Sequence, residues 1–186
     1  LLVAGVLDIL RFNEYFFAAS IAGFKNSEIE YLFRKYNNLA LFILQVRIKS
    51  KAKLIRAGFN TYDYFFNLNE KDQVLIRKGL FDMSTLLFSE KAKSIYLPTV
   101  SKNYKIEESN EHKINDLDIK SLKLASVHQM GSVPMGKYVN ERGELIGYPN
   151  IYISDSSVLP TSIGESPQLT IMSFAKNIAD SFSIKN

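Results

Sequence analysis

Residues 126–172 constrain the fold of this chain most, because they place glycines and prolines between a strand-like run and an amphipathic helix. A short β-capable run predicts a strand over residues 122–128, in which Leu122, Leu124, Ser126 and His128 alternate with Lys123, Ala125 and Val127. Gly131 and Gly136 follow this run, and glycines favour loops in which another backbone or a ligand approaches closely. The pattern therefore predicts that a strand delivers His128 into a loop.

Two interpretations of His128 stay open on the residues alone. Histidine is the side chain most suited to proton transfer near neutral pH, and its place before the glycines suits an acid or base of an enzyme. A lone histidine is nevertheless a weak signal, because its ring can simply hydrogen-bond within the loop.

A second strand and a helix are expected after this loop. The β-branched and aromatic run at residues 150–154 predicts a buried strand, and Asp155 follows it at once. Apolar residues then recur at helical spacing over residues 168–182. Ser166 before Pro167 suits the N-cap of this helix, whose free N–H groups can face an anionic or carbonyl-rich ligand. Every helix needs a cap, however, and most capped helices bind nothing.

The order of these residues resembles the C-terminal signature of the glucose-methanol-choline (GMC) flavoprotein oxidoreductases. The resemblance is ordered and nearly free of gaps, and it rests on His128, Met130, Gly131, Pro134, Met135, Gly136, Gly147, Asn150, Tyr152, Asp155, Ser157, Pro160, Thr161, Gly164, Pro167, Leu169, Thr170, Ile171 and Met172.

The resemblance implies roles for seven residues. His128 stands where the family has the base that faces the flavin ring and takes the proton of the substrate hydroxyl. Ser166 stands where the family has a second His or Asn that shares the substrate oxygen; a serine hydroxyl can hydrogen-bond but is not a base near neutral pH. The residues implied to contact FAD are Asp155, Ser156, Pro167, Gln168 and Leu169. No metal site is expected.

The resemblance also implies that part of the enzyme lies outside this chain. The family's FAD-binding unit begins with a strand, a Gly-x-Gly-x-x-Gly loop and a helix, and that fingerprint is absent from the 186 residues. We expect a C-terminal portion, with residues 1–130 forming part of the substrate domain and residues 131–186 returning to the FAD-binding domain. The N-terminal half would come from the same gene or from a separate chain.

The first half of the chain predicts an antiparallel sheet backed by helices, hence an α+β fold. Residues 1–24 are expected to form a buried helix, or a strand followed by a helix, and residues 26–36 a further helix. The runs at 39–48 and 52–57 are interpreted as a hairpin to which 62–66 adds a strand. Asn69 caps a predicted helix that ends near Phe88.

The polar residues 101–118 are expected to form a surface loop, and His112 within it to be solvated.

The composition of the chain excludes few classes of function. The formal net charge of +4 is spread without a long single-sign block, so a solvated lysine-rich surface is favoured over a nucleic-acid partner. The apolar start of the chain is too short and too interrupted to span a membrane. The absence of cysteine is compatible with a reducing compartment, and we expect a cytoplasmic protein.

Three functions are weighed. The favoured one is the C-terminal part of an FAD-dependent oxidoreductase that oxidises an alcohol, with the missing N-terminal half as its partner. The alternative is a non-catalytic remnant or interaction subunit of the same fold. An unrelated basic binding module is disfavoured by the ordered motif.

Overall fold

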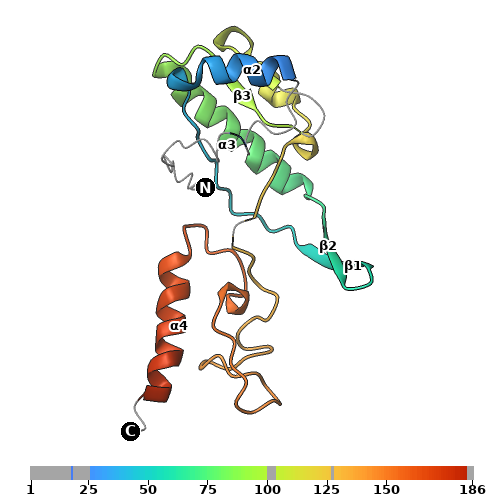
Figure 1. Ribbon diagram of the computed structural model, residues 1–186, viewed down its shortest axis with the longest axis vertical. Helices are drawn as coiled ribbons and strands as arrows, with labels where there is room; N and C mark the ends of the chain where they lie inside the picture. Colours follow the sequence, from blue (N-terminus) through green and yellow to red (C-terminus); the bar gives the residue numbers. More distant parts are fainter. Residues whose placement is uncertain (1–17, 19–25, 100–103, 127, 184–186) are drawn as a thin grey trace. The chain divides into compact units, whose positions relative to one another are not determined.

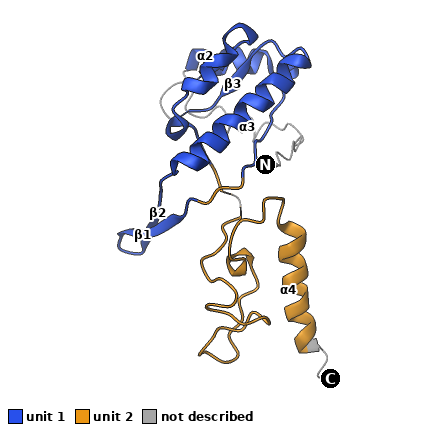
Figure 2. Cartoon of the chain, turned by 180° about the vertical axis from the view of Figure 1, so that it is seen from behind, with its two compact units in different colours: residues 1–46, 50–124 blue, residues 47–49, 125–186 orange. Residues whose placement is uncertain are grey.

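The computed structural model describes residue 18 and residues 26–99, 104–126 and 128–183, which form two compact units (Figures 1 and 2). The first unit comprises residues 1–46 and 50–124, and the second comprises residues 47–49 and 125–186. The element predicted over residues 1–24 lies outside the described residues, apart from residue 18. The functional division near residue 130 stays a prediction.

Two helices of the first unit form where the sequence predicts them. The helix α2 spans Asn26–Arg34 and is followed by the 3-10 helix η1, Tyr36–Asn38. The helix α3 spans Glu70–Ser89. The side chain of Asn69 caps α3 by accepting a hydrogen bond from the backbone N–H of Asp72 at 2.9 Å, as the sequence indicates.

The hairpin of the first unit pairs other residues than predicted. Strand β1 (Ala52–Gly58) pairs antiparallel with β2 (Thr61–Phe66), and Asn60 in the turn has a φ of 59°. Asn tolerates this left-handed conformation, which two-residue hairpin turns require. Residues 39–48 have no regular structure, so the predicted pairing of 39–48 with 52–57 is wrong. The short turn at Phe59 and Asn60 joins the two neighbouring runs directly, which favours their pairing with each other.

The predicted surface loop at 101–118 is also wrong for the residues that are described. Strand β4 (Tyr104–Ile106) pairs with β3 (Ile95–Leu97) in a second antiparallel sheet. The 3-10 helices η2 (Glu108–Asp116) and η3 (Ile119–Ser121) follow. Ile106, Ile114 and Ile119 are almost completely buried. Burial of these three apolar side chains stabilises a segment that is otherwise polar. His112 is exposed, as expected.

The core of the first unit lies between α3 and the segments that follow it. Arg77 of α3 donates to the carbonyl of Leu117 at 3.1 Å, and Ser84 and Thr85 donate to the carboxylate of Glu111. The buried apolar side chains of this core are Leu68, Ile76, Leu80, Phe88, Leu97, Ile106, Ile114, Leu117, Ile119 and Leu122.

The irregular segment before the hairpin is fixed along α3 at two points. A Cβ added to Gly79 would stand 3.0 Å from the Leu44 side chain, so only glycine admits this packing without a shift. Asp72, itself buried, accepts hydrogen bonds from the backbone and side chain of Ser50 and from Asn69 Nδ2. The helix start and the segment are therefore joined by one charge-assisted network.

An exposed ion pair marks the junction of β4 and η2. The ammonium of Lys105 donates to the carboxylate of Glu107, which is the N-cap residue of η2. This hydrogen bond lowers the pKa of Glu107 and raises the pKa of Lys105. Because both groups are exposed, the pair contributes little to stability.

The second unit is built from loops that pack on one helix. The helix α4 spans Gln168–Ser183, as the periodicity predicts. A Cβ on Gly143, whose φ is 75°, would stand 2.6 Å from Ile178 and 3.3 Å from Phe174, both on α4. The rings of Tyr152 and Phe182 meet edge to face, with centroids 4.8 Å apart. These contacts hold α4 against residues 143–152.

The described residues thus form an α+β fold with two small antiparallel sheets, compatible with the predicted class. No helix among them is both long enough and apolar enough to cross a membrane.

The cap of α3 yields a first prediction. Replacing Asn69 with Ala removes the acceptor for the Asp72 N–H and a donor to the buried Asp72 carboxylate. We expect the free energy of unfolding to fall by about 1–3 kcal/mol. Urea titration followed by circular dichroism measures it. Asn67→Ala is the matched control, because Asn67 is exposed and its side chain makes no hydrogen bond within the described residues; equal losses for the two variants would contradict the assigned network.

Candidate functional site

The described residues that precede His128 form an irregular segment and not a strand. Leu122 pairs with Thr99 in an isolated antiparallel bridge, whereas residues 123–126 have no regular structure. The strand predicted at 122–128 is therefore wrong for the described residues, because beyond Leu122 no neighbouring strand pairs with them. His128 is half-buried.

The loop after His128 is joined to the turn after Asp155 by a short run of backbone hydrogen bonds. Val133 donates to the carbonyl of Ser157 at 3.1 Å, and Met135 donates to that of Val158 at 2.9 Å. The Ser156 hydroxyl donates to the carbonyl of Gln129 at 2.8 Å. We call this set the loop zipper. It places the predicted base and a predicted cofactor contact on two loops that lie side by side.

Gly131 permits the closest approach within the loop zipper. Its φ is 81°, and a Cβ there would stand 3.1 Å from the carbonyl oxygen of Pro160. A side chain at this position would suffer both an unfavourable backbone conformation and a collision with another backbone. The backbone conformation and the close contact with Pro160 thus explain why position 131 is a glycine.

Asp155 organises its own turn. One carboxylate oxygen accepts the backbone N–H of Ser157 at 2.7 Å and so caps the 3-10 helix η4, Ser156–Val158. Val158 is buried beneath the turn, while Asp155 is exposed. The buried strand predicted at 150–154 is wrong, because the segment forms only one isolated bridge, between Tyr152 and Glu144.

The start of α4 lies one residue later than the predicted cap implies. The first helical hydrogen bond runs from the N–H of Ile171 to the carbonyl of Pro167 at 2.9 Å, so Pro167 occupies the cap position and Ser166 precedes it. Pro167 is buried, whereas Gln168 is exposed and Leu169 is 74% exposed. The N–H groups of the first turn have no partner within the helix, which leaves them for an anionic or carbonyl group.

The structure brings together some of the predicted site residues. The loop zipper joins the loop of His128 to that of Asp155 and Ser156. No hydrogen bond within the described residues joins His128 to Ser166. Sequence reasoning missed the part played by Gln129, whose carbonyl accepts from Ser156, since a carbonyl acceptor leaves no trace in residue type.

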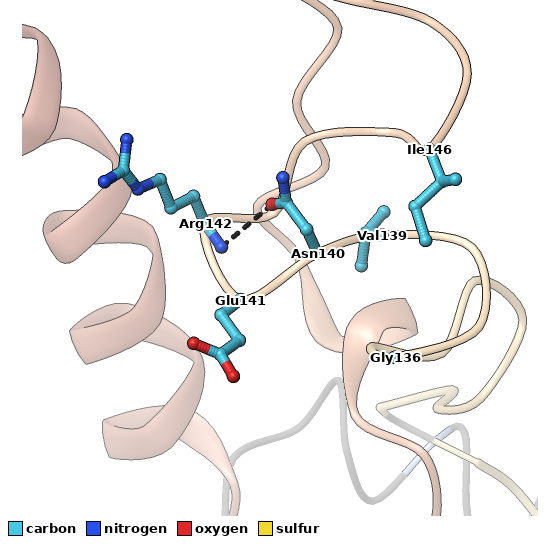
Figure 3. Close-up of a pocket in the computed structure, with 6 residues that line it drawn as sticks. All are labelled: Gly136, Val139, Asn140, Glu141, Arg142 and Ile146. Atoms are coloured by element: carbon cyan, nitrogen blue, oxygen red, sulfur yellow. Dashed lines mark hydrogen bonds between the residues drawn. The ribbon is translucent and has the colours of Figure 1, made fainter.

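An open depression lies elsewhere in the second unit (Figure 3). It is lined by Gly136, Val139, Asn140, Glu141, Arg142 and Ile146. The Asn140 side chain accepts the N–H of Arg142 and thereby shapes the turn. None of the predicted site residues lines this depression. In the described ranges, no group of acidic or histidine side chains is arranged to hold a metal ion.

Comparison with known proteins identifies the class of protein to which these loops belong. A protein-family model for a C-terminal domain, described as GMC oxidoreductase, matches residues 45–175. The chain therefore belongs to the GMC oxidoreductase family, and the resemblance drawn from the motif is confirmed. Members of this family are in general flavoproteins.

Two curated relatives are similar to this chain. An uncharacterised GMC-type oxidoreductase of Sinorhizobium fredii is 27% identical over 131 residues, which are 66% of this chain and 26% of that protein. A long-chain-alcohol oxidase of Arabidopsis thaliana is 30% identical over 129 residues, which are 59% of this chain and 17% of that protein. The chain thus spans 26% and 17% of the lengths of these two curated relatives. No solved structure matches it significantly.

The loop zipper yields a second prediction. In Gly131→Ala, we expect the left-handed backbone to cost about 1–2 kcal/mol and the collision with Pro160 to add roughly 1–3 kcal/mol. Hydrogen exchange at the amides of Val133 and Met135 should therefore accelerate. Gly147→Ala is the control, because Gly147 has a φ of 84° but open space around its Cβ position; unchanged exchange in Gly131→Ala would contradict the close approach.

Proposed function

We propose that this chain is the C-terminal part of an FAD-dependent oxidoreductase that oxidises the CH–OH group of an alcohol. The observation that carries the proposal is the loop zipper, because it sets the loop of His128 beside the turn of Asp155 within a chain of the GMC oxidoreductase family. The name of the Arabidopsis relative makes a long-chain alcohol the first substrate to test.

The residues of the chain fit a flavin nucleotide in two places. The N–H groups in the first turn of α4 have no partner within the helix and lie beside the exposed Gln168 and Leu169, and such a turn suits phosphate or carbonyl oxygens. Asp155 and Ser156 stand on the turn next to the loop of His128. FAD, when bound, supplies acceptance of a hydride. The glycine fingerprint for its pyrophosphate is absent from this sequence, so a further polypeptide segment has to provide it.

The proposed mechanism gives His128 the proton and Ser166 an orienting role. The substrate hydroxyl lies near the His128 imidazole, which removes its proton as the carbon loses a hydride. The Ser166 hydroxyl can hydrogen-bond the same oxygen, but it cannot replace the base. The half-buried position of His128 limits the directions from which water reaches the ring. The protein thus contributes orientation and a base.

The partner requirement yields a third prediction. We expect this chain to retain flavin only together with the polypeptide encoded immediately upstream of it. Flavin absorbance that co-elutes with the protein on gel filtration measures this, and bleaching by an added long-chain alcohol measures turnover. Bound flavin that no alcohol bleaches would favour the non-catalytic remnant or interaction subunit, and no flavin under either condition would contradict the proposal.

The role of His128 yields a fourth prediction. In the assembled enzyme, His128→Ala should slow reduction of the flavin by roughly two to four orders of magnitude, the range expected for loss of a general base. Stopped-flow absorbance after mixing with alcohol measures the rate. His112→Ala is the matched control, because His112 is the only other histidine and is exposed on η2. Reduction at the wild-type rate in His128→Ala would remove His128 from the mechanism.

A further inference from the structure

The hairpin β1–β2 is the most exposed apolar element among those described in the first unit. Every residue of both strands is exposed, and Phe59 in the turn is 88% exposed. Leu54 and Tyr64, which face each other across the two strands, are 59% and 64% exposed. Among the described residues the two strands form a sheet of their own (Figure 1).

The register shows that both faces of the hairpin are apolar. Residues opposite each other share a face, and side chains alternate along each strand. One face therefore carries Leu54, Tyr62, Tyr64 and Phe66 together with Arg56, and the other carries Ile55 and Phe65 together with Lys53 and Asp63. A hairpin at an ordinary protein surface packs one face on its own core. Within the described part of the chain, neither face of this hairpin is packed.

Such a hairpin is unsuited to stand alone. An isolated two-stranded sheet is marginally stable in water, and its outer edges present unpaired backbone groups. The Asp63 carboxylate accepts the Tyr64 N–H at 2.7 Å, which satisfies one of these groups locally. Both faces and the edges are otherwise of the kind that another polypeptide covers.

The composition of the hairpin favours a protein over a membrane or a nucleic acid. Its strands carry two cations, Lys53 and Arg56, against one anion, Asp63, so the charge is too low for a polyanion site. Tyrosine, phenylalanine and arginine are the residues enriched at the centre of protein interfaces. The chain also spans only 26% and 17% of its two relatives, so most of a GMC enzyme lies beyond the matched region.

We infer that the hairpin β1–β2 is the docking surface for the remaining, flavin-binding part of the enzyme, which extends the sheet and covers both faces. The inference rests on the proposed function for the identity of the partner. It adds the location: Leu54, Tyr62, Tyr64 and Phe66 of the first unit hold the partner, whereas the residues assigned to the reaction belong to the second unit.

The test uses the full chain and the polypeptide encoded immediately upstream of it. We expect Tyr64→Asp and Leu54→Asp each to weaken association about tenfold or more, the usual loss when an interface anchor is removed. Titration by light scattering measures the affinity. Amides 52–66 should gain hydrogen-exchange protection only in the complex. Tyr31→Asp is the matched control, because Tyr31 is 52% exposed on α2.

The possible outcomes distinguish an error in the docking surface from an error in the proposed function. Wild-type affinity in both hairpin variants, with circular dichroism unchanged, overturns the docking surface even if the complex binds flavin. Protection of the hairpin through self-association of this chain, with no binding of the upstream polypeptide, also overturns it. A complex that is lost in the hairpin variants but contains no flavin supports the surface and contradicts the proposed function.

Discussion

The arrangement of the candidate site depends on the backbone hydrogen bonds of the loop zipper. Residues 128–136 have little regular structure of their own, and residues 155–160 contain only the short 3-10 helix η4 that Asp155 caps. The donors Val133 and Met135 and the carbonyls that accept from them give the loops a common register. Gly131 then allows the two backbones to approach more closely than a side chain would permit. The histidine loop is thus positioned by backbone contacts rather than by its own side chains.

The sequence predicts the helices well because their signals are local. Asn69 and the apolar periodicity after it lie within one segment, and α3 forms there. Strands form only when they pair with another segment, and local sequence patterns do not identify that segment. Residues 39–48 look as strand-like as residues 61–66, yet the short turn at Phe59 and Asn60 decides the pairing. The isoleucines buried at 106, 114 and 119 have no periodicity that would reveal them.

The candidate site was predictable as a set of residues and not as a geometry. The ordered motif places this chain in its family, as the match over residues 45–175 confirms. The individual roles of His128, Ser166 and the cofactor contacts stay predictions. What the motif does not contain is the hydrogen bonding between distant backbones, such as that from Met135 to Val158. Nor does it show that Pro167, and not Ser166, occupies the cap position of α4.

The division of the chain into units has a consequence for dissecting the protein. Residues 47–49 belong to the second unit although the first unit surrounds them in sequence. The Arg47 side chain lies 3.1 Å from the position of a Cβ on Gly164, whose φ of 85° only glycine adopts readily. A fragment that starts after Leu124 would leave Arg47 behind. The second unit is therefore discontinuous in sequence, and no single cut of the chain yields it whole.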